Sequence, residues 1–211
     1  MKRFLIWTSV LVGLGLAVWG MAKLATSPGN QSPLVSSAIS DTDWVKGNRG
    51  ASVVLIEYSD LQCPGCAAYA PIVNRITEEF GDQIAFVYRH FPLPQHKNAE
   101  LAGEAAEAAG KQGKFWEMVD RIFASQNTWS DESNARETFI TEAQSIGLDV
   151  NKFEVDLDSK ETKDKVENDY LSGIQSRVNS TPTFFLNGEK IQPRNEDEFR
   201  SLILQKLAQN P

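Results

Sequence analysis

Hydrophobic residues recur along this chain with two different periods, and the two periods predict two kinds of element. Three short apolar runs, rich in β-branched and aromatic residues, are typical of buried strands in a covered sheet. These runs cover residues 52–58, 83–91 and 183–186. Longer segments with apolar residues every three or four positions are typical of helices with one buried face. They cover residues 64–80, 115–123, 139–146 and 166–178, and an alanine- and glutamate-rich segment, 99–109, joins them as a predicted helix.

One helix of the middle region is predicted from a stripe at a spacing of four. The stripe consists of Val166, Tyr170, Ile174 and Val178. The mixed charges of residues 160–169 are expected to form the solvated face of the same helix.

Near the C-terminus the pattern changes from helix to hairpin. Residues 183–186 and 189–192 are predicted strands joined by Asn187-Gly188, a sequence typical of a two-residue type I′ turn. Asn195, with Glu198 three residues later, predicts the N-terminal cap of a last helix.

The order of these elements predicts the fold. A strand, a helix and a second strand within residues 52–91 indicate a right-handed βαβ unit, and the chain ends with two strands and a helix. These outer pieces form a thioredoxin-like sheet, so we predict an α/β fold with a helical insertion over about 95–177.

The N-terminus predicts a membrane anchor. Residues 4–22 carry no charge, and 19 helical residues span ~28 Å, about one bilayer core. Lys2 and Arg3 precede this run, so the N-terminus is expected to stay in the cytoplasm and the rest of the chain to be exported. We assign residues 1–25 to a single-pass anchor. The alternative is a signal peptide cleaved after Ala22, which would export the domain equally.

A linker is expected between the anchor and the folded domain. Residues 26–42 contain two prolines, a glycine and five serines, and such a coil has an r.m.s. span of ~20–25 Å. Residues 43–211 then form the domain, held outside the cytoplasm (periplasm or cell surface) and close to the membrane.

Composition excludes several classes of protein. The 211 residues include 28 acidic and 21 basic side chains, a net charge of −7, with no Lys/Arg-rich run. Nucleic-acid binding is therefore not expected. Only two cysteines are present, which excludes a disulfide-stapled mini-protein and a four-cysteine zinc site.

The two cysteines form the motif Cys63-Pro64-Gly65-Cys66, for which three interpretations are open. A zinc site would need two more ligands, and besides carboxylates only two histidines are available. A structural disulfide across four residues would remove little chain entropy, so it would stabilise the fold weakly. The third interpretation is a redox pair.

The position of the motif favours the redox pair. Cys63 follows a strand and a turn and precedes a helix whose first position is Pro64, where proline is well tolerated. Cys63 would then be the N-cap, and the positive end of the helix dipole would lower its pKa. Cys66, one turn later, points back toward Cys63 and can resolve a mixed disulfide. No metal or other cofactor is needed for this chemistry.

From about Trp44 to the C-terminus, the sequence resembles the DsbA-like thiol–disulfide oxidoreductases, in their membrane-tethered bacterial branch. The segments that carry the resemblance are 45–48, 57–66, 88–93, 113–116 and 179–185. The resemblance implies an enzyme that oxidises thiols of unfolded or reduced exported proteins. It also implies reoxidation by a membrane partner, a quinone-coupled thiol oxidase.

The resemblance extends to individual residues. Thr181-Pro182 matches the family's cis-proline loop, which faces the cysteines, and with Pro64 and Gly65 it is expected to contact substrate. From the residues alone, Pro182 could equally begin a strand. Gly65 departs from the family pattern, because the best-studied members carry histidine there.

Glu57, six residues before Cys63, matches the family's buried acidic residue. If it is buried, its raised pKa suits it to take the proton from Cys66. From the residues alone it could also be a half-exposed carboxylate at a strand end.

Structural roles, rather than catalytic ones, are expected for several other side chains. His90 and His96 are interpreted as strand-end and loop residues, and Asp60 as a turn residue. Phe115 and Trp116 are expected in the core of the insertion. Two other functions stay open: an extracytoplasmic disulfide reductase or isomerase, and a metal-binding chaperone that uses the CxxC motif and a histidine.

Overall fold

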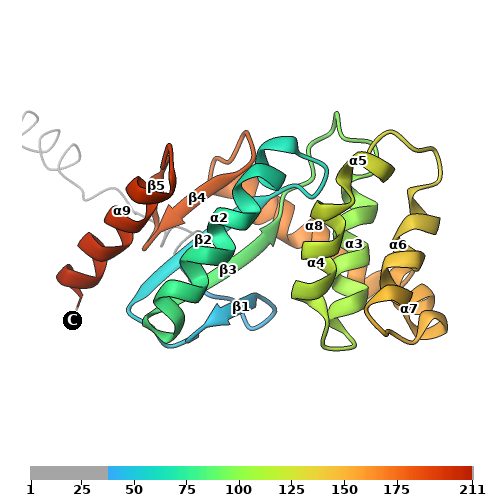
Figure 1. Cartoon of the computed structure of the whole chain (residues 1–211), viewed down its shortest axis with the longest axis horizontal. Helices are drawn as coiled ribbons and strands as arrows, with labels where there is room; N and C mark the ends of the chain where they lie inside the picture. The colour runs from blue at the N-terminus through green and yellow to red at the C-terminus, as the bar shows by residue number, and fades with distance from the viewer. Residues whose placement is uncertain (1–37, 211) are drawn as a thin grey trace, which may run out of the picture. The chain divides into compact units, whose positions relative to one another are not determined.

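The structure is a computed structural model that describes residues 38–210 (Figure 1). In chain order, the strands and helices are β1 (Trp44–Gly47), β2 (Val53–Ser59), α2 (Pro64–Phe80), η1 (Gly81–Gln83), β3 (Ile84–His90), α3 (Ala99–Gly110), α4 (Phe115–Ala124), α5 (Gln126–Trp129), α6 (Ala135–Ser145), α7 (Val150–Leu157), α8 (Lys160–Gln175), β4 (Thr183–Leu186), β5 (Glu189–Ile191) and α9 (Glu196–Gln209).

The strands form one five-stranded sheet in the order β1-β3-β2-β4-β5. β2 and β3 are parallel, and the other neighbouring pairs are antiparallel. The predicted strands are confirmed as β2, β3 and β4, and the predicted hairpin as β4 and β5. Asn187 and Gly188 have φ values of 49° and 82°, the two positive angles that a type I′ turn requires.

β1 is the strand that the sequence pattern missed. It has four residues, includes Lys46 and ends at Gly47, so it shows neither an apolar run nor an alternation. It is a strand because it pairs with β3, where Trp44 lies opposite Tyr88 and Lys46 opposite Phe86. Its existence therefore depends on a partner strand 38 to 44 residues away in the sequence.

The side chains of the central strand alternate between two hydrophobic clusters. Leu55 joins the larger cluster, which lies beneath α2 and continues into the helical insertion. Ile56 joins the smaller cluster, on the opposite side of the sheet, together with Phe91 and Tyr170. With both faces covered, β2 and β3 are buried almost throughout, which explains their near-continuous apolar sequence.

The chain leaves the sheet after β3, forms the helices α3 to α8, and returns to the sheet at β4. This order confirms the predicted helical insertion. In Figure 1, α3, α4, α6 and α7 lie to one side of the sheet, α2 lies over the strands, and α9 lies at the opposite end beside β5. Phe115 and Trp129 are fully buried in this part of the larger cluster. The short helices α5 and α7 were not predicted from the apolar pattern.

One expectation for α8 is wrong, and a second holds only in part. Val178 lies beyond the helix, which ends at Gln175, and Ile174 is 49% exposed. The chain turns away at Arg177, where φ is 59°, so the stripe does not continue. The face expected to be solvated is also partly buried, because Lys165 and Asp169 form an ion pair of 2.5 Å with side chains only 11% and 7% exposed.

Residues just before β1 are fastened to the sheet. The Arg89 guanidinium donates to Asp43 Oδ2 at 2.7 Å and to the carbonyl oxygen of Ala38 at 2.7 Å. Residues 38–42, the last part of the expected linker, therefore contact the domain. The predicted anchor and the linker up to residue 37 lie outside the described residues. Among residues 38–210, no helix combines the length and apolar character needed to cross a bilayer.

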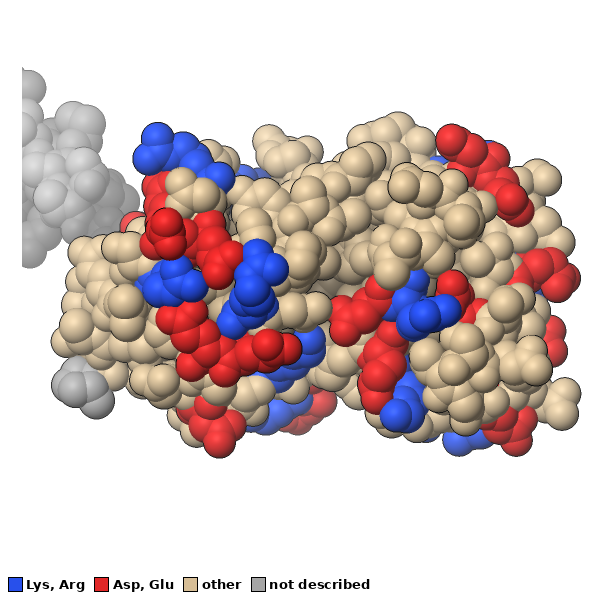
Figure 2. Space-filling view, viewed as in Figure 1, with Lys and Arg blue, Asp and Glu red and all other residues tan. Residues whose placement is uncertain are grey.

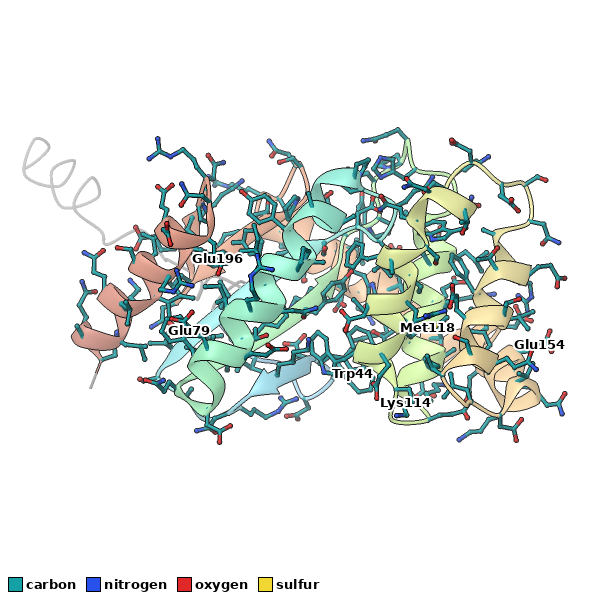
Figure 3. All side chains as sticks on the ribbon, viewed as in Figure 1. Trp44, Glu79, Lys114, Met118, Glu154 and Glu196 are labelled. Carbon is teal, nitrogen blue, oxygen red and sulfur yellow. The ribbon has the colours of Figure 1, made fainter. Side chains whose placement is uncertain are left out.

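The C-terminal helix is joined to α2 by surface ion pairs. The predicted cap is confirmed, since the Glu198 backbone N–H donates to Asn195 Oδ1 at 2.9 Å. Arg75 of α2 pairs with Glu196 of α9, and Arg200 of α9 pairs with Glu79 of α2. In Figure 2, Lys/Arg and Asp/Glu side chains lie next to one another over the part of the molecule where Figure 1 draws α2 and α9, and Figure 3 labels Glu79 and Glu196 there.

Candidate active site

Both cysteines lie in the first turn of α2, at the end of the sheet where β2 finishes. Cys63 is the N-cap residue, with extended backbone angles, and Pro64 takes the first helical position. The Cys63 backbone N–H donates to the carbonyl oxygen of Asp60 at 3.0 Å, which closes the turn between β2 and α2. The local sequence therefore builds the helix start that was predicted for Cys63.

The surroundings of Cys63 favour its thiolate. Its pKa is lowered to about 5, chiefly because the Cys66 thiol donates a hydrogen bond to it. Thr181 and the backbone N–H groups of Gly65 and Cys66 add to this effect, while partial burial opposes it. Cys63 is 8% exposed, whereas Cys66 is fully buried. A thiolate in this position is the reactive form of cysteine.

Cys66 has the opposite character. It is fully buried, and this burial raises its pKa well above the usual range. The negative charges of Glu57 and Cys63 raise it further. One contact acts the other way, since the backbone N–H of Asp60 donates to Cys66 Sγ at 3.4 Å. The pair thus consists of one cysteine whose thiolate is favoured and one whose thiol is favoured.

The loop before β4 faces the cysteines. The Thr181–Pro182 peptide bond is cis, as the family resemblance implied. The carbonyl oxygen of Thr181 lies 3.5 Å from Cys63 Sγ. A Cβ atom placed on Gly65 would lie 3.5 Å from both Cys63 Sγ and the Pro182 ring. The four residues expected to contact substrate, Pro64, Gly65, Thr181 and Pro182, are therefore gathered around Cys63.

Glu57 lies on β2, on the sheet face beneath α2, and is buried, which resolves the alternative of a half-exposed strand end. This burial raises its pKa to about 7, and the negative charge of Cys63 adds to the rise. It lines a cavity of about 20 Å³, next to Tyr88 and Lys46. A hydrogen bond from the Ser59 hydroxyl and the positive charge of Lys46 oppose this rise in pKa. Glu57 is therefore a carboxyl group that can gain and lose a proton near neutral pH, close enough to Cys66 to influence its charge.

The helical insertion also binds the turn between β2 and α2 that ends at Cys63 (the cysteine turn). The sequence pattern did not predict these contacts. Gln126 of α5 donates from its side-chain amide to the carbonyl oxygens of Leu61 and Cys63, at 2.9 and 3.2 Å. The side chain of Gln62 accepts from the Asn98 backbone N–H at 2.7 Å. A glutamine at an insertion helix carries no motif, so no local signal identifies these contacts.

Asp60 and His96 are the other residues whose importance the sequence understated. They were interpreted as a turn residue and a loop residue, and both positions are correct. The structure adds that Asp60 is fully buried and that its Oδ2 lies 2.7 Å from His96 Nδ1. The two residues are 36 positions apart, so their contact could not be read from spacing.

The described part of the chain holds one group of side chains with the spacing of metal ligands: His90, Glu107 and Asp169, all buried. Each has protein partners, since Glu107 accepts from the Trp44 indole at 2.9 Å and from His90, and Asp169 pairs with Lys165. An ammonium group already neutralises one carboxylate, so this cluster fits a structural network better than a metal centre. It joins β3 to α3 and α8 and includes neither cysteine.

Comparisons with known proteins agree with this geometry. A family model described as thioredoxin matches residues 39–205. The crystal structure of Wolbachia pipientis α-DsbA1 superposes with a TM-score of 0.72 at 22% identity, covering 81% of this chain and 94% of that one. Oxidised BdbD from Bacillus subtilis superposes with a TM-score of 0.67 at 25% identity, covering 78% and 92%.

The chain also matches part of the sequence of much longer proteins. A protein of Herminiimonas arsenicoxydans named Na(+)/H(+) antiporter NhaA is 36% identical over 174 residues, which are 82% of this chain and 26% of that protein. A Mycobacterium protein (strain KMS) named Na(+)/H(+) antiporter NhaA 1 is 36% identical over 162 residues, 25% of its length. The chain thus spans about a quarter of the curated relatives that it matches.

Proposed function

The chain belongs to the thioredoxin family, with the fold of its DsbA-like thiol–disulfide oxidoreductases, and we propose that it introduces disulfides into exported proteins. The observation that carries this proposal is the contrast between the two cysteines. The pKa of Cys63 is lowered to about 5, whereas burial raises that of Cys66. A reactive thiolate beside a buried thiol is the arrangement that dithiol exchange requires.

In the proposed reaction the pair begins as a disulfide. A substrate thiolate attacks Cys63 Sγ, so that a bond forms between the two sulfurs, the Cys63–Cys66 bond breaks, and its electron pair passes to Cys66 Sγ. A second substrate thiolate then attacks the substrate sulfur of this mixed disulfide, and Cys63 leaves as a thiolate. The substrate has lost two electrons, and the cysteine pair has gained them.

Glu57 handles the proton of this reaction. The Cys66 thiolate formed in the first step is buried and takes up a proton, because burial disfavours its charge. Glu57, with a pKa of about 7, is protonated in part of the molecules at neutral pH and can supply this proton. When the pair is reoxidised, the proton returns from Cys66 to Glu57.

The same thiolate sets the expected direction of electron flow. Whatever stabilises the Cys63 thiolate stabilises the reduced protein, and its disulfide becomes more oxidising. This favours an oxidant over a reductase. The lack of a histidine at Gly65 acts the other way, so we expect a potential between those of thioredoxin and DsbA.

Substrate contacts are proposed for Pro64, Gly65, Thr181 and Pro182, the residues gathered around Cys63. The surface over the start of α2 and over α5 carries few charged side chains in the view of Figure 2. A surface of this kind suits unfolded, reduced chains, whose contacts vary in sequence.

The place of action rests on the sequence. An uncharged run at residues 4–22 preceded by two positive charges supports a single-pass anchor with the domain outside the cytoplasm. Each turnover leaves the cysteine pair reduced, so an acceptor must reoxidise it. The family resemblance supports a membrane quinone-coupled thiol oxidase as that partner. The ion exchange named in the antiporter relatives is not proposed for this chain, which matches only a quarter of their length.

The alternative of a metal-binding chaperone receives no support from the donor set. Among residues 38–210, neither histidine joins the cysteines: His90 bonds to Glu107 and His96 to Asp60. The alternative of a reductase or isomerase differs from the proposal in reduction potential.

Equilibration of the purified protein against glutathione redox buffers tests the proposal. We expect a potential of roughly −150 to −220 mV, with the reduced form melting at a higher temperature than the oxidised form. A value below about −250 mV, with the oxidised form more stable, would make the protein a reductase. N-terminal sequencing and fractionation test the anchor separately, and a soluble form beginning near Lys23 would refute it.

A further inference from the structure

A single residue outside the CxxC motif contacts both cysteines through its backbone. The Asp60 carbonyl oxygen accepts from the Cys63 N–H at 3.0 Å. The Asp60 N–H donates to Cys66 Sγ at 3.4 Å. Asp60 thus acts on the two cysteines differently, because its hydrogen bond reaches the sulfur atom of Cys66 but only the backbone of Cys63.

The carboxylate of Asp60 is held by three donors. Its Oδ1 accepts from the Gln62 backbone N–H at 2.7 Å. Its Oδ2 accepts from the Leu93 backbone N–H at 2.8 Å and lies 2.7 Å from His96 Nδ1. A carboxylate only accepts, so Nδ1 is the ring nitrogen that carries the proton. The Asp60 side chain is fully buried, while that of His96 is 20% exposed.

Two of these donors come from the loop between β3 and α3, which has no other role in the proposed mechanism. The third is local and forms the turn itself. The loop therefore clamps the Asp60 side chain from outside the turn, and the position of the Asp60 amide depends on this clamp.

From these contacts we propose that the Asp60 amide stabilises the Cys66 thiolate as it leaves, and that His96 is the positioning residue that holds this amide. The inference rests on the proposed disulfide exchange. When a thiolate attacks Cys63 Sγ, the Cys63–Cys66 bond breaks and its electron pair passes to Cys66 Sγ. The charge appears in a buried place, where a preformed N–H donor has its largest effect.

The amide and Glu57 then act at different moments. The Asp60 N–H meets the charge while the sulfur–sulfur bond breaks. Glu57 then supplies a proton to the Cys66 thiolate. The neutral thiol that results no longer needs the hydrogen bond from Asp60. A loosened amide slows only the steps in which Cys66 is the leaving group, whereas a loosened fold would slow every reaction of Cys63.

The test is the rate at which dithiothreitol reduces the Cys63–Cys66 disulfide of the full-length protein. His96→Ala removes the side-chain donor and should slow reduction roughly threefold to tenfold, the factor that one weakened hydrogen bond represents. His96→Gln keeps an N–H that can reach Asp60 and should retain most of the rate. Gln95→Ala, at the exposed neighbouring position of the same loop, should leave the rate unchanged.

A second arm removes Cys66 from the chemistry. In a Cys66→Ser protein whose Cys63 carries a mixed disulfide with thionitrobenzoate, dithiothreitol releases the aromatic thiol without involving position 66. Here His96→Ala should have no effect. The proposal is overturned if His96→Ala slows this release as much as it slows reduction of the native disulfide, or if it slows neither.

The two proposals can fail separately. A potential in the reductase range would refute the proposed function, yet Cys66 would still leave when the disulfide is reduced, and the rate ratio would still be measured. Conversely, an oxidising potential with no His96 effect would refute only the role of the Asp60 amide.

Discussion

Glu57 in the sheet and Glu104 in α3 of the helical insertion are both buried glutamates whose pKa burial raises to about 7. Their neighbours differ. Glu57 interacts with the charge of Cys63 and raises the pKa of Cys66, so its proton is coupled to the redox pair. The charges that act on Glu104 belong to other residues of the insertion, chiefly Lys163 and Glu100.

The comparison shows what a raised pKa means by itself. Burial alone produces it, since removing a carboxylate from water disfavours its charged form wherever the site lies. A role in chemistry requires, in addition, an electrostatic interaction with a group whose charge changes during the reaction. Glu57 meets that requirement and Glu104 does not, although their pKa values are alike.

The largest expected effect concerns the redox pair on which the comparison depends. If Cys63 is the attacked sulfur, Cys66→Ser should accumulate mixed disulfides with exported proteins, because the Cys66 thiol can no longer attack Cys63 Sγ and release a bound substrate. Cys63→Ser should accumulate none, and both variants should lose all oxidase activity. Non-reducing electrophoresis of membrane extracts measures this. The reverse pattern would exchange the roles of the two cysteines and remove the reason to single out Glu57.

The next effect separates the two glutamates directly. When the pKa of a carboxyl group is higher in the folded state than in the unfolded state, the group loses its proton at a lower pH in the unfolded state. The free energy of unfolding therefore falls as the pH rises between about 4.5 and 7, and it stays lower above that range. The substitutions Glu57→Gln and Glu104→Gln each remove this loss. Each should therefore raise the free energy of unfolding of the reduced protein more at pH 8 than at pH 5, by up to about 3 kcal/mol. Urea unfolding at the two pH values measures it.

Redox state sharpens this test. Oxidation removes the Cys63 thiolate, whose charge raises the pKa of Glu57, so that pKa should be lower in the oxidised protein. Glu104 has no such partner and should titrate identically in both forms. Carboxyl titration by NMR, with each Gln variant used for assignment, measures both values. A redox-dependent shift at Glu104, or none at Glu57, would contradict the distinction drawn above.

The smallest expected effect is at Gly65. A side chain fits there, since a Cβ atom would make ordinary contacts with Cys63 Sγ and Pro182. Gly65→His should place an imidazole beside the Cys63 thiolate and stabilise the reduced form. We expect the potential to rise by about 10 to 30 mV, with 30 mV corresponding to about 1.4 kcal/mol. Gly65→Ala adds only the Cβ and should change it little. A fall in potential would show that the missing histidine does not limit the oxidising strength.

Much of the site follows from the sequence alone. The spacing of Cys63 and Cys66, Pro64 at the helix start and the apolar strand before them obey local rules, because a helix N-terminus and its dipole are built by neighbouring residues. The same holds for the Asn187-Gly188 turn and the Asn195 cap. Glu57, Thr181 and Pro182 were identified through a family resemblance, and only the fold brings them to the cysteines.

Chain segments that depend on distant partners were predicted less well. β1 forms only by pairing with β3, and the charged face expected for α8 is partly buried by the His90, Lys165 and Asp169 network. The same applies to Ile174, which the periodic stripe placed in the core and the chain turn left exposed.

The sequence by itself therefore determined the CxxC pair, the order of elements and the strand–helix junction at Cys63, since each depends on residues within one or two turns of chain. Tertiary structure alone decided the burial of Glu57, the contact between Asp60 and His96, and the hydrogen bond from Gln126 to the Cys63 carbonyl oxygen. These contacts join segments 36 to 63 residues apart, and solvent exclusion and hydrogen bonding between such segments exist only after the chain has packed.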